Sequence, residues 1–181
     1  ASQAGIAYGS AAFEAGVRQF QENLAAIREF AHDAGIPLIV TSLVSNEQAL
    51  PPFLSEPAQP GIAMASTMAT AEALQQLPAL LKTAPENALL HYQYGLALLQ
   101  NRQPEAALQS LQQARDLDLL RFRAPTRFNQ VLRDLSKTPG VWLADAETLF
   151  RQHSNDGILG SELLLEHVHP NQQGYQLIAD S

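Results

Sequence analysis

Hydrophobic positions recur at three- and four-residue intervals through the first part of the chain. They are Phe13, Val17, Phe20, Leu24 and Ile27, followed by Phe30 or Ala31. This spacing places apolar side chains on one face of a helix, so it predicts a helix over residues 11–34. Ser10 suits the N-cap position and Gly35 supplies the stop.

A continuous apolar run rich in β-branched residues follows at once, over residues 37–44. Such a run is typical of a strand that is buried on both faces of a parallel sheet. Residues 141–145 predict a second short strand that ends at Asp145. Because a helix, a glycine and a buried strand make half of a βαβ unit, we expect an α/β layer.

The segment after the first predicted strand indicates an irregular loop. Ser45 and Asn46 open it at the carboxyl end of the strand, where open α/β sheets place ligands. Four prolines follow within a short stretch, at positions 51, 52, 57 and 60. They predict a connection or lid that runs along the surface.

From about residue 67 to residue 118 the chain is rich in Ala, Leu and Gln at helical spacing, with a period of 34 residues. Positions 73, 77, 80 and 85 align with positions 107, 111, 114 and 119. Tyr94-Gly95 lies between the two aligned sets of positions. Residues 88–121 therefore resemble one tetratricopeptide repeat, preceded by the second helix of another. Tyr94 and Leu119 depart from that family's usual Leu and Pro. A generic helical hairpin is the alternative.

Tetratricopeptide-like helices imply a surface that holds a peptide or protein partner. Because a solenoid normally needs three or more repeats to bury its core, we expect these helices to be an insertion packed on the α/β layer. Further helices are predicted at 126–136, at 146–151 and from about 171. The chain then divides into 1–66, 67–121 and 122–181.

Composition narrows the classes of function. Among the 181 residues, 46% are hydrophobic and 16% are charged, which is typical of a globular protein. The formal net charge of -7 argues against nucleic acid as a partner, because phosphate binding needs clustered Lys and Arg. The absence of cysteine excludes disulfides and thiolate metal sites. No apolar run approaches the ~20 residues of a membrane span, and residues 1–5 lack the features of a signal peptide.

The strongest candidate chemistry lies near the end, in the sequence Glu166-His167-Val168-His169-Pro170. A carboxylate that orients an imidazole leaves the second ring nitrogen free to take a proton from a nucleophile, as in a catalytic triad. Pro170 keeps the preceding residue out of an α-helix, and Asn171 suits the N-cap of the helix that follows. The alternative is a histidine that only packs or caps at a loop–helix junction.

A metal site is a second interpretation of the same segment. Alternate histidines in an extended chain point to one side, so Glu166, His167 and His169 could together hold zinc or iron. His153 is the only further ligand nearby in the sequence. Because no motif completes the ligand set, we predict neither a metal nor a cofactor.

The segment resembles the last conserved block of the SGNH/GDSL hydrolase superfamily, in which an acidic residue, two spacers and the catalytic His precede a Pro, a Gly and a closing helix. The likeness extends to bacterial members of this superfamily that carry a tetratricopeptide insertion. It includes the long helix, the strand over 37–44, Pro52-Phe53, the tetratricopeptide-like helices and Asp118-x-x-Arg121-Phe122-Arg123-Ala124-Pro125. The resemblance implies that His169 is the base and Glu166 its acidic partner, although that acid is usually Asp.

The resemblance also implies the fold and the chemistry. The fold would be α/β, a partial flavodoxin-like parallel sheet with flanking helices and the inserted hairpin. The reaction would be cofactor-free hydrolysis or transfer of a small acyl ester, for example on an acetylated saccharide. Likeness to the family suggests the bacterial envelope or export, but no residue in the chain fixes the localisation.

The family's Gly-Asp-Ser and Gly-x-Asn blocks do not occur in this sequence. Ser10 suits a helix cap better than a nucleophile, and Ser42 and Ser45 are followed by a proline-rich loop instead of the required helix. We therefore expect the chain to be the C-terminal part of a serine esterase whose nucleophile lies outside these residues. The sheet would then expose an apolar surface. The alternative is a non-catalytic tetratricopeptide scaffold.

Arg123 and Asn46 are predicted substrate-binding residues, because both would stand near carboxyl ends of strands. An arginine there could bind a carboxylate or an oxygen-rich substrate. The alternatives are a salt bridge from Arg123 to Asp116 or Asp118, and a turn at Asn46.

Overall fold

The computed structural model describes residues 5–55 and 68–181 of the chain. This part is mixed α/β and mostly helical, with seven α-helices and one small parallel sheet of two strands. The α/β class predicted from the sequence is confirmed at this level. The predictions for Pro57, Pro60 and the beginning of the helical region at residue 67 lie outside the described residues.

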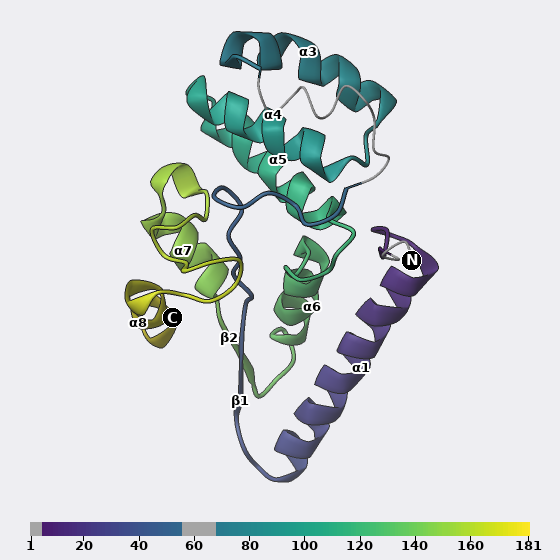
Figure 1. The fold of residues 1–181 in the computed structure, drawn as a ribbon. Helices are drawn as coiled ribbons and strands as arrows, with labels where there is room; N and C mark the ends of the chain where they lie inside the picture. The colour runs from purple at the N-terminus through teal and green to yellow at the C-terminus, as the bar shows by residue number, and fades with distance from the viewer. Residues whose placement is uncertain (1–4, 56–67) are drawn as a thin grey trace.

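The elements follow the predicted order (Figure 1). They are α1 (Ala11–Asp33), β1 (Leu38–Thr41), α3 (Thr70–Thr83), α4 (Ala88–Gln100), α5 (Pro104–Leu117), α6 (Thr126–Leu135), β2 (Val141–Ala144), α7 (Ala146–His153), a 3-10 turn at Asn155–Gly157, and α8 (Gln172–Ala179).

The predicted helix ends are confirmed. The Ser10 hydroxyl oxygen accepts the Phe13 N–H at the beginning of α1, and Gly35 has a positive φ of 67° just after its end. Asn171 caps α8 by accepting the Gly174 N–H at 3.0 Å. These caps satisfy N–H groups that have no partner within the helix.

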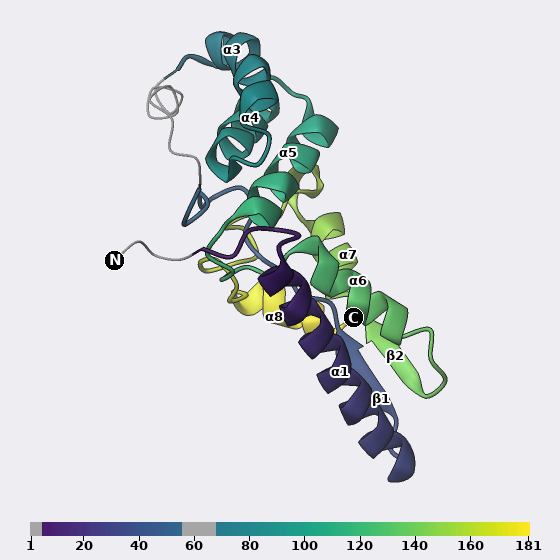
Figure 2. The same ribbon diagram turned by 90° about the vertical axis from the view of Figure 1, so that its right-hand side faces the viewer.

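The sheet is covered by helices on one face. Val40 of β1 and Val141 of β2 are buried with Leu132 of α6, and Phe20 and Leu24 of α1 pack against this cluster. Figure 2 shows α1 and α6 running beside the two strands.

The other face of the sheet is open, and the prediction that the first strand is buried on both faces is wrong. Ile39 pairs with Trp142 across the strands, and these side chains are 70% and 55% exposed. Alternate residues of a strand point to opposite faces, so a layer on one face leaves the other in contact with solvent. Within the described residues, nothing covers this face at Ile39.

Helices α3, α4 and α5 form the compact upper part in Figure 1. Gly95 lets α4 approach α5 closely, because a Cβ at this position would lie 2.7 Å from Cγ of Leu111. The helices are joined to the α/β part by the Tyr92 hydroxyl, which donates to the Gln48 carbonyl at 2.8 Å. Ile158 also packs into their core. These three helices thus pack on the remainder of the chain.

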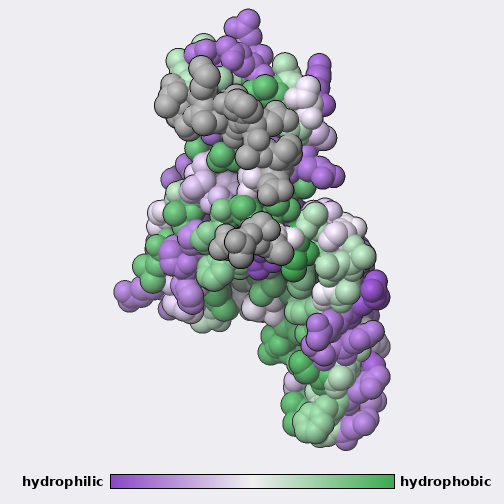
Figure 3. Space-filling view, turned by 45° about the vertical axis from the view of Figure 1, so that its right-hand side comes forward, coloured by the Kyte–Doolittle hydropathy of each residue, from purple (hydrophilic) through white to green (hydrophobic). Residues whose placement is uncertain are grey.

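Apolar side chains also remain exposed on the arm formed by α1. Ile27 and Phe30 lie near its carboxyl end and are largely exposed, and Figure 3 shows hydrophobic and hydrophilic strips side by side on this arm. Among the helices of the described part, none is long and apolar enough to cross a membrane.

Candidate functional site

A tight turn holds Glu166 and His169 together. Leu164 and Pro170 form an antiparallel bridge, and Leu165 donates its N–H to the His169 carbonyl at 2.8 Å. Between these paired backbones the chain reverses direction within a few residues. The carboxylate and the imidazole therefore stand on one loop just before α8, as the sequence predicts.

The Glu166 carboxylate binds this loop through one oxygen. Its Oε1 atom lies 2.5 Å from Nδ1 of His169 and also accepts the backbone N–H groups of His169 at 2.8 Å and Val168 at 3.2 Å. The His169 side chain is 66% exposed, so the imidazole is accessible to a second molecule. A carboxylate on Nδ1 fixes the tautomer in which Nε2 can accept a proton.

The surroundings of Glu166 keep its carboxylate ionised. Desolvation acts to raise its pKa, but backbone N–H groups of His169, Val168 and His167 and the His169 ring outweigh this effect and lower the pKa to about 2. Hydrogen bonds to the charged form are the cause of the net shift. Glu166 is thus an anion across the whole range in which an imidazole titrates.

His167 joins this loop to two other segments, and sequence reasoning did not assign it this role. Its Nδ1 lies 3.3 Å from Oε2 of Glu166, and its ring stacks on Phe53 with centroids 4.3 Å apart. The Phe122 ring meets it edge-on at 5.6 Å. Its carbonyl accepts the Asn46 N–H at 2.8 Å. Such contacts join residues far apart in sequence, so no local pattern could reveal them.

Arg123 and Asn46 are buried, and their side chains bind atoms of the protein. Arg123 donates to Asp118 Oδ2 at 3.2 Å and to the carbonyls of Asn46 at 2.9 Å and Leu50 at 3.2 Å. The Asn46 side chain accepts the Ala49 N–H at 2.8 Å in a turn. The structure therefore contains the salt bridge to Asp118 and the turn that the sequence left open as alternatives. The substrate-binding role stays a prediction.

A network of charged side chains around the buried Glu47 connects the loop after β1 to α5, α6 and α7. Glu47 is fully buried and receives hydrogen bonds from Arg115 at 2.8 Å and from Arg151 at 2.9 Å. Arg151 also binds Glu147, which in turn binds Arg133. Sequence reasoning missed this network, because its members come from a loop and three helices with no common spacing.

The three candidate serines form no hydrogen bond with His169 in the described part of the chain. The Ser42 hydroxyl donates to Asp145 Oδ1 at 2.9 Å and accepts the Glu147 N–H at 2.8 Å. Ser45 is buried, and Ser10 caps α1. Among residues 5–55 and 68–181, no hydrogen bond joins any of these serines to His169.

The same part of the chain holds no group of three or more His, Cys, Asp or Glu residues arranged for a metal ion. His153, the possible further ligand, lies at the end of α7, where its Nδ1 is 2.9 Å from the Leu149 carbonyl.

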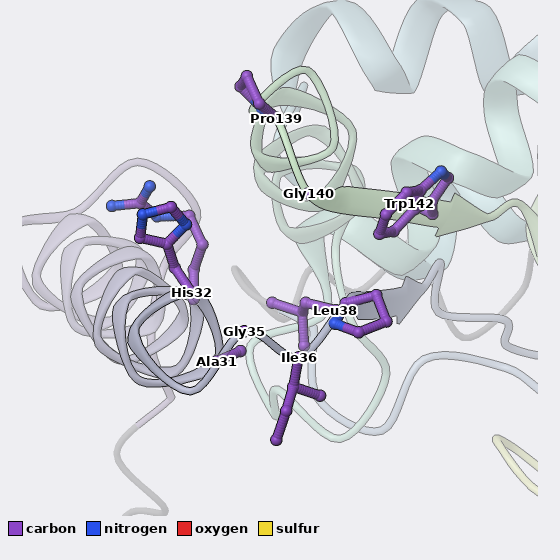
Figure 4. Close-up of a pocket in the computed structure, with 10 residues that line it drawn as sticks. Ala31, His32, Gly35, Ile36, Leu38, Pro139, Gly140 and Trp142 are labelled. Atoms are coloured by element: carbon purple, nitrogen blue, oxygen red, sulfur yellow. The ribbon is translucent and has the colours of Figure 1, made fainter.

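Two cavities border the sheet at opposite ends. One of about 370 Å³ lies beyond the carboxyl end of β1, and it is lined by Leu43, Phe122 and Phe128 together with the beginning of α1. Phe122 separates it from His167. The other, of about 320 Å³, lies at the amino ends of the strands, where His32 and Trp142 stand on opposite sides (Figure 4).

Comparison of the chain with protein-family models, with curated proteins and with solved structures gives no match.

Proposed function

We propose that the chain is the C-terminal part of an SGNH-type serine esterase, with a partial flavodoxin-like sheet. The observation that carries the proposal is the 2.5 Å contact between Glu166 Oε1 and His169 Nδ1 on an exposed loop. The loop follows β2 through α7, and its His167 carbonyl is bonded to the loop after β1. This places it at the carboxyl end of a parallel sheet, where α/β proteins bind ligands.

In this mechanism His169 is the general base. Its Nε2 accepts the proton of a serine hydroxyl as the serine oxygen attacks the ester carbonyl, and the ionised Glu166 stabilises the imidazolium that forms. The imidazolium then returns the proton to the leaving alcohol, so an acyl-enzyme remains. Water, deprotonated by the same imidazole, then attacks the acyl carbonyl. The ester bond to the serine breaks, the imidazolium returns the proton to the serine oxygen, and the acid is released.

The free edge of β1 supports the proposal that a further segment carries the nucleophile. Within the described residues β1 pairs only with β2, so its other edge offers unpaired N–H and C=O groups. Ile36, just before β1, and Ile39, within it, are exposed. A parallel strand added there would end at the same end of the sheet as the His169 loop, which is where the serine is needed.

The 370 Å³ cavity supports the proposal that the substrate is small. Its size is at the lower end for ligand pockets, and its walls are mainly apolar, with Arg121 at one side. We propose that it receives the acyl group, or the acetylated ring of a saccharide, with the Phe122 ring between this group and the loop that carries His167 and His169.

The second proposal is the non-catalytic scaffold, with a peptide or protein held by the tetratricopeptide-like helices. Part of the helical surface is occupied by the chain itself, because Tyr92 binds Gln48 and Ile158 packs against these helices. This packing favours a structural role for the insertion over a peptide groove.

Turnover of p-nitrophenyl acetate by this chain and by the full-length gene product tests the esterase proposal. We expect activity in the full-length product and a loss of about 10²–10⁴-fold in His169→Ala, since general base catalysis contributes that much. His153→Ala is the matched control, because His153 is an exposed histidine outside the loop. Equal activity of the His169→Ala and His153→Ala variants would reject the proposed base.

A further inference from the structure

We propose that Arg123 and Asn46 are positioning residues, which act through His167 to hold the Glu166–His169 pair in place. This inference rests on the proposed function for its catalytic meaning and replaces the substrate-binding role that the sequence suggests for the same two residues. Each of its steps is a contact within the chain.

The first step fixes the loop after β1. Asp118 accepts the backbone N–H groups of Phe53 at 2.8 Å and Leu54 at 3.0 Å, while Arg123 binds the carbonyls of Asn46 and Leu50. Arg123 and Asp118 also bind each other at 3.2 Å, and both are buried. One ion pair therefore holds the beginning and the end of residues 46–54.

The second step joins this loop to the histidine loop at two points. The Asn46 N–H donates to the His167 carbonyl at 2.8 Å, and the Phe53 ring stacks on the His167 ring. The Phe122 ring packs edge-on against both of these rings. His167 is thus held by its backbone and by its side chain.

The third step passes from His167 to the catalytic pair. The ring of His167 lies 3.3 Å from one oxygen of Glu166, and the other oxygen lies 2.5 Å from His169. The carboxylate thus lies between the two rings, hydrogen-bonded to His169 through Oε1 and in contact with His167 through Oε2, so the His167 ring limits its rotation away from the base. This is the requirement for a preorganised imidazole, since a displacement of about 1 Å in a catalytic group can cost about 10²-fold in rate.

The test must avoid unfolding the chain. Removing Arg123 would leave Asp118 as an uncompensated buried charge, which is strongly destabilising. The half-exposed Phe53 is the better target, and Phe53→Leu removes the stacked ring while Phe53→Tyr retains it. Phe30→Leu is the matched control, because Phe30 is an exposed phenylalanine on α1.

The first readout is NMR of this chain, which needs no nucleophile. In the parent we expect a downfield proton resonance for His169 Nδ1–H bonded to Glu166, and a Glu166 carboxyl that titrates at about 2. Phe53→Leu should broaden the resonance and raise the Glu166 midpoint, whereas Phe53→Tyr and Phe30→Leu should match the parent. An unchanged resonance and midpoint in Phe53→Leu would overturn the inference.

The second readout is kinetic and uses the full-length gene product. Arg123→Lys keeps a positive charge beside Asp118 but has only one nitrogen, whereas Arg123 uses one nitrogen for the two carbonyls and another for the carboxylate. We expect this variant to lower kcat about 10–100-fold at unchanged KM. A raised KM at unchanged kcat would instead assign Arg123 to substrate binding and overturn the positioning role. The NMR result stands apart from this assay, so a protein with the expected NMR behaviour but no esterase activity would refute only the proposed function.

Discussion

Arg151 holds the carboxylate of Glu47 through both terminal nitrogens of its guanidinium, with two hydrogen bonds of 2.9 Å between residues 104 positions apart in the sequence. Bidentate pairs of this kind combine charge with fixed geometry. Because Glu47 follows Asn46 directly, the pair connects α7 to the loop that contacts His167. Burial acts to lower the pKa of Arg151, but its bonds to Glu47 and Glu147 raise it overall.

We predict that Glu47→Ala lowers the free energy of unfolding by about 3–5 kcal/mol, because it removes the buried carboxylate that Arg115 and Arg151 share and leaves each arginine with one other carboxylate partner. Urea denaturation followed by circular dichroism measures the change. Glu29→Ala, which removes a partly exposed pair with Arg28, should change stability by no more than about 1 kcal/mol. Similar values for the two variants would show that the Glu47 network does not stabilise the fold.

Gly95→Ala should destabilise the chain by about 1–3 kcal/mol. The added Cβ would lie 2.7 Å from Cγ of Leu111, so α4 and α5 must move apart, and this overpacking exceeds the intrinsic helix preference for Ala. Gly16→Ala is the matched control in α1, since its Cβ would meet nothing within 4 Å and should stabilise by about 0.4–1 kcal/mol. Thermal unfolding of both variants checks the opposite signs, and a stabilised Gly95→Ala would contradict the close helix contact.

Glu166 should not titrate in the neutral range. A carboxyl whose pKa is lowered in the folded chain stabilises the fold fully above its unfolded pKa, near 4.5, and this contribution is lost as the pH falls toward about 2. If the proposed esterase activity is present, its loss in acid should therefore follow protonation of an imidazole and not of Glu166. A ¹³C titration of the Glu166 carboxyl measures this directly, and a midpoint near 4.5 would show that the backbone N–H groups do not hold the carboxylate.

The sequence predicts the local features of this fold well. The apolar period of α1, its Ser10 cap and the Asn171 cap of α8 depend on neighbouring residues, and the structure confirms them. The proximity of Glu166 and His169 is also a local feature, because the two residues are three positions apart in one turn.

The remainder of the site could not be predicted from the sequence, because it depends on long-range packing. The predicted burial of β1 on both faces is wrong at Ile39, because an apolar run does not say which neighbouring layers are present. The stacking of Phe53 on His167 and the pairing of Glu47 with Arg151 join loops and helices whose relative placement only the folded chain defines.

A fluorophosphonate probe labels a serine that a neighbouring base has activated. In the proposed mechanism His169, held by Glu166, activates a serine outside these 181 residues. We expect the full-length gene product to be labelled, this chain alone to remain unlabelled, and His169→Ala in the full-length product to abolish labelling. Labelling that persists in His169→Ala, or its absence from the full-length product, would contradict this mechanism.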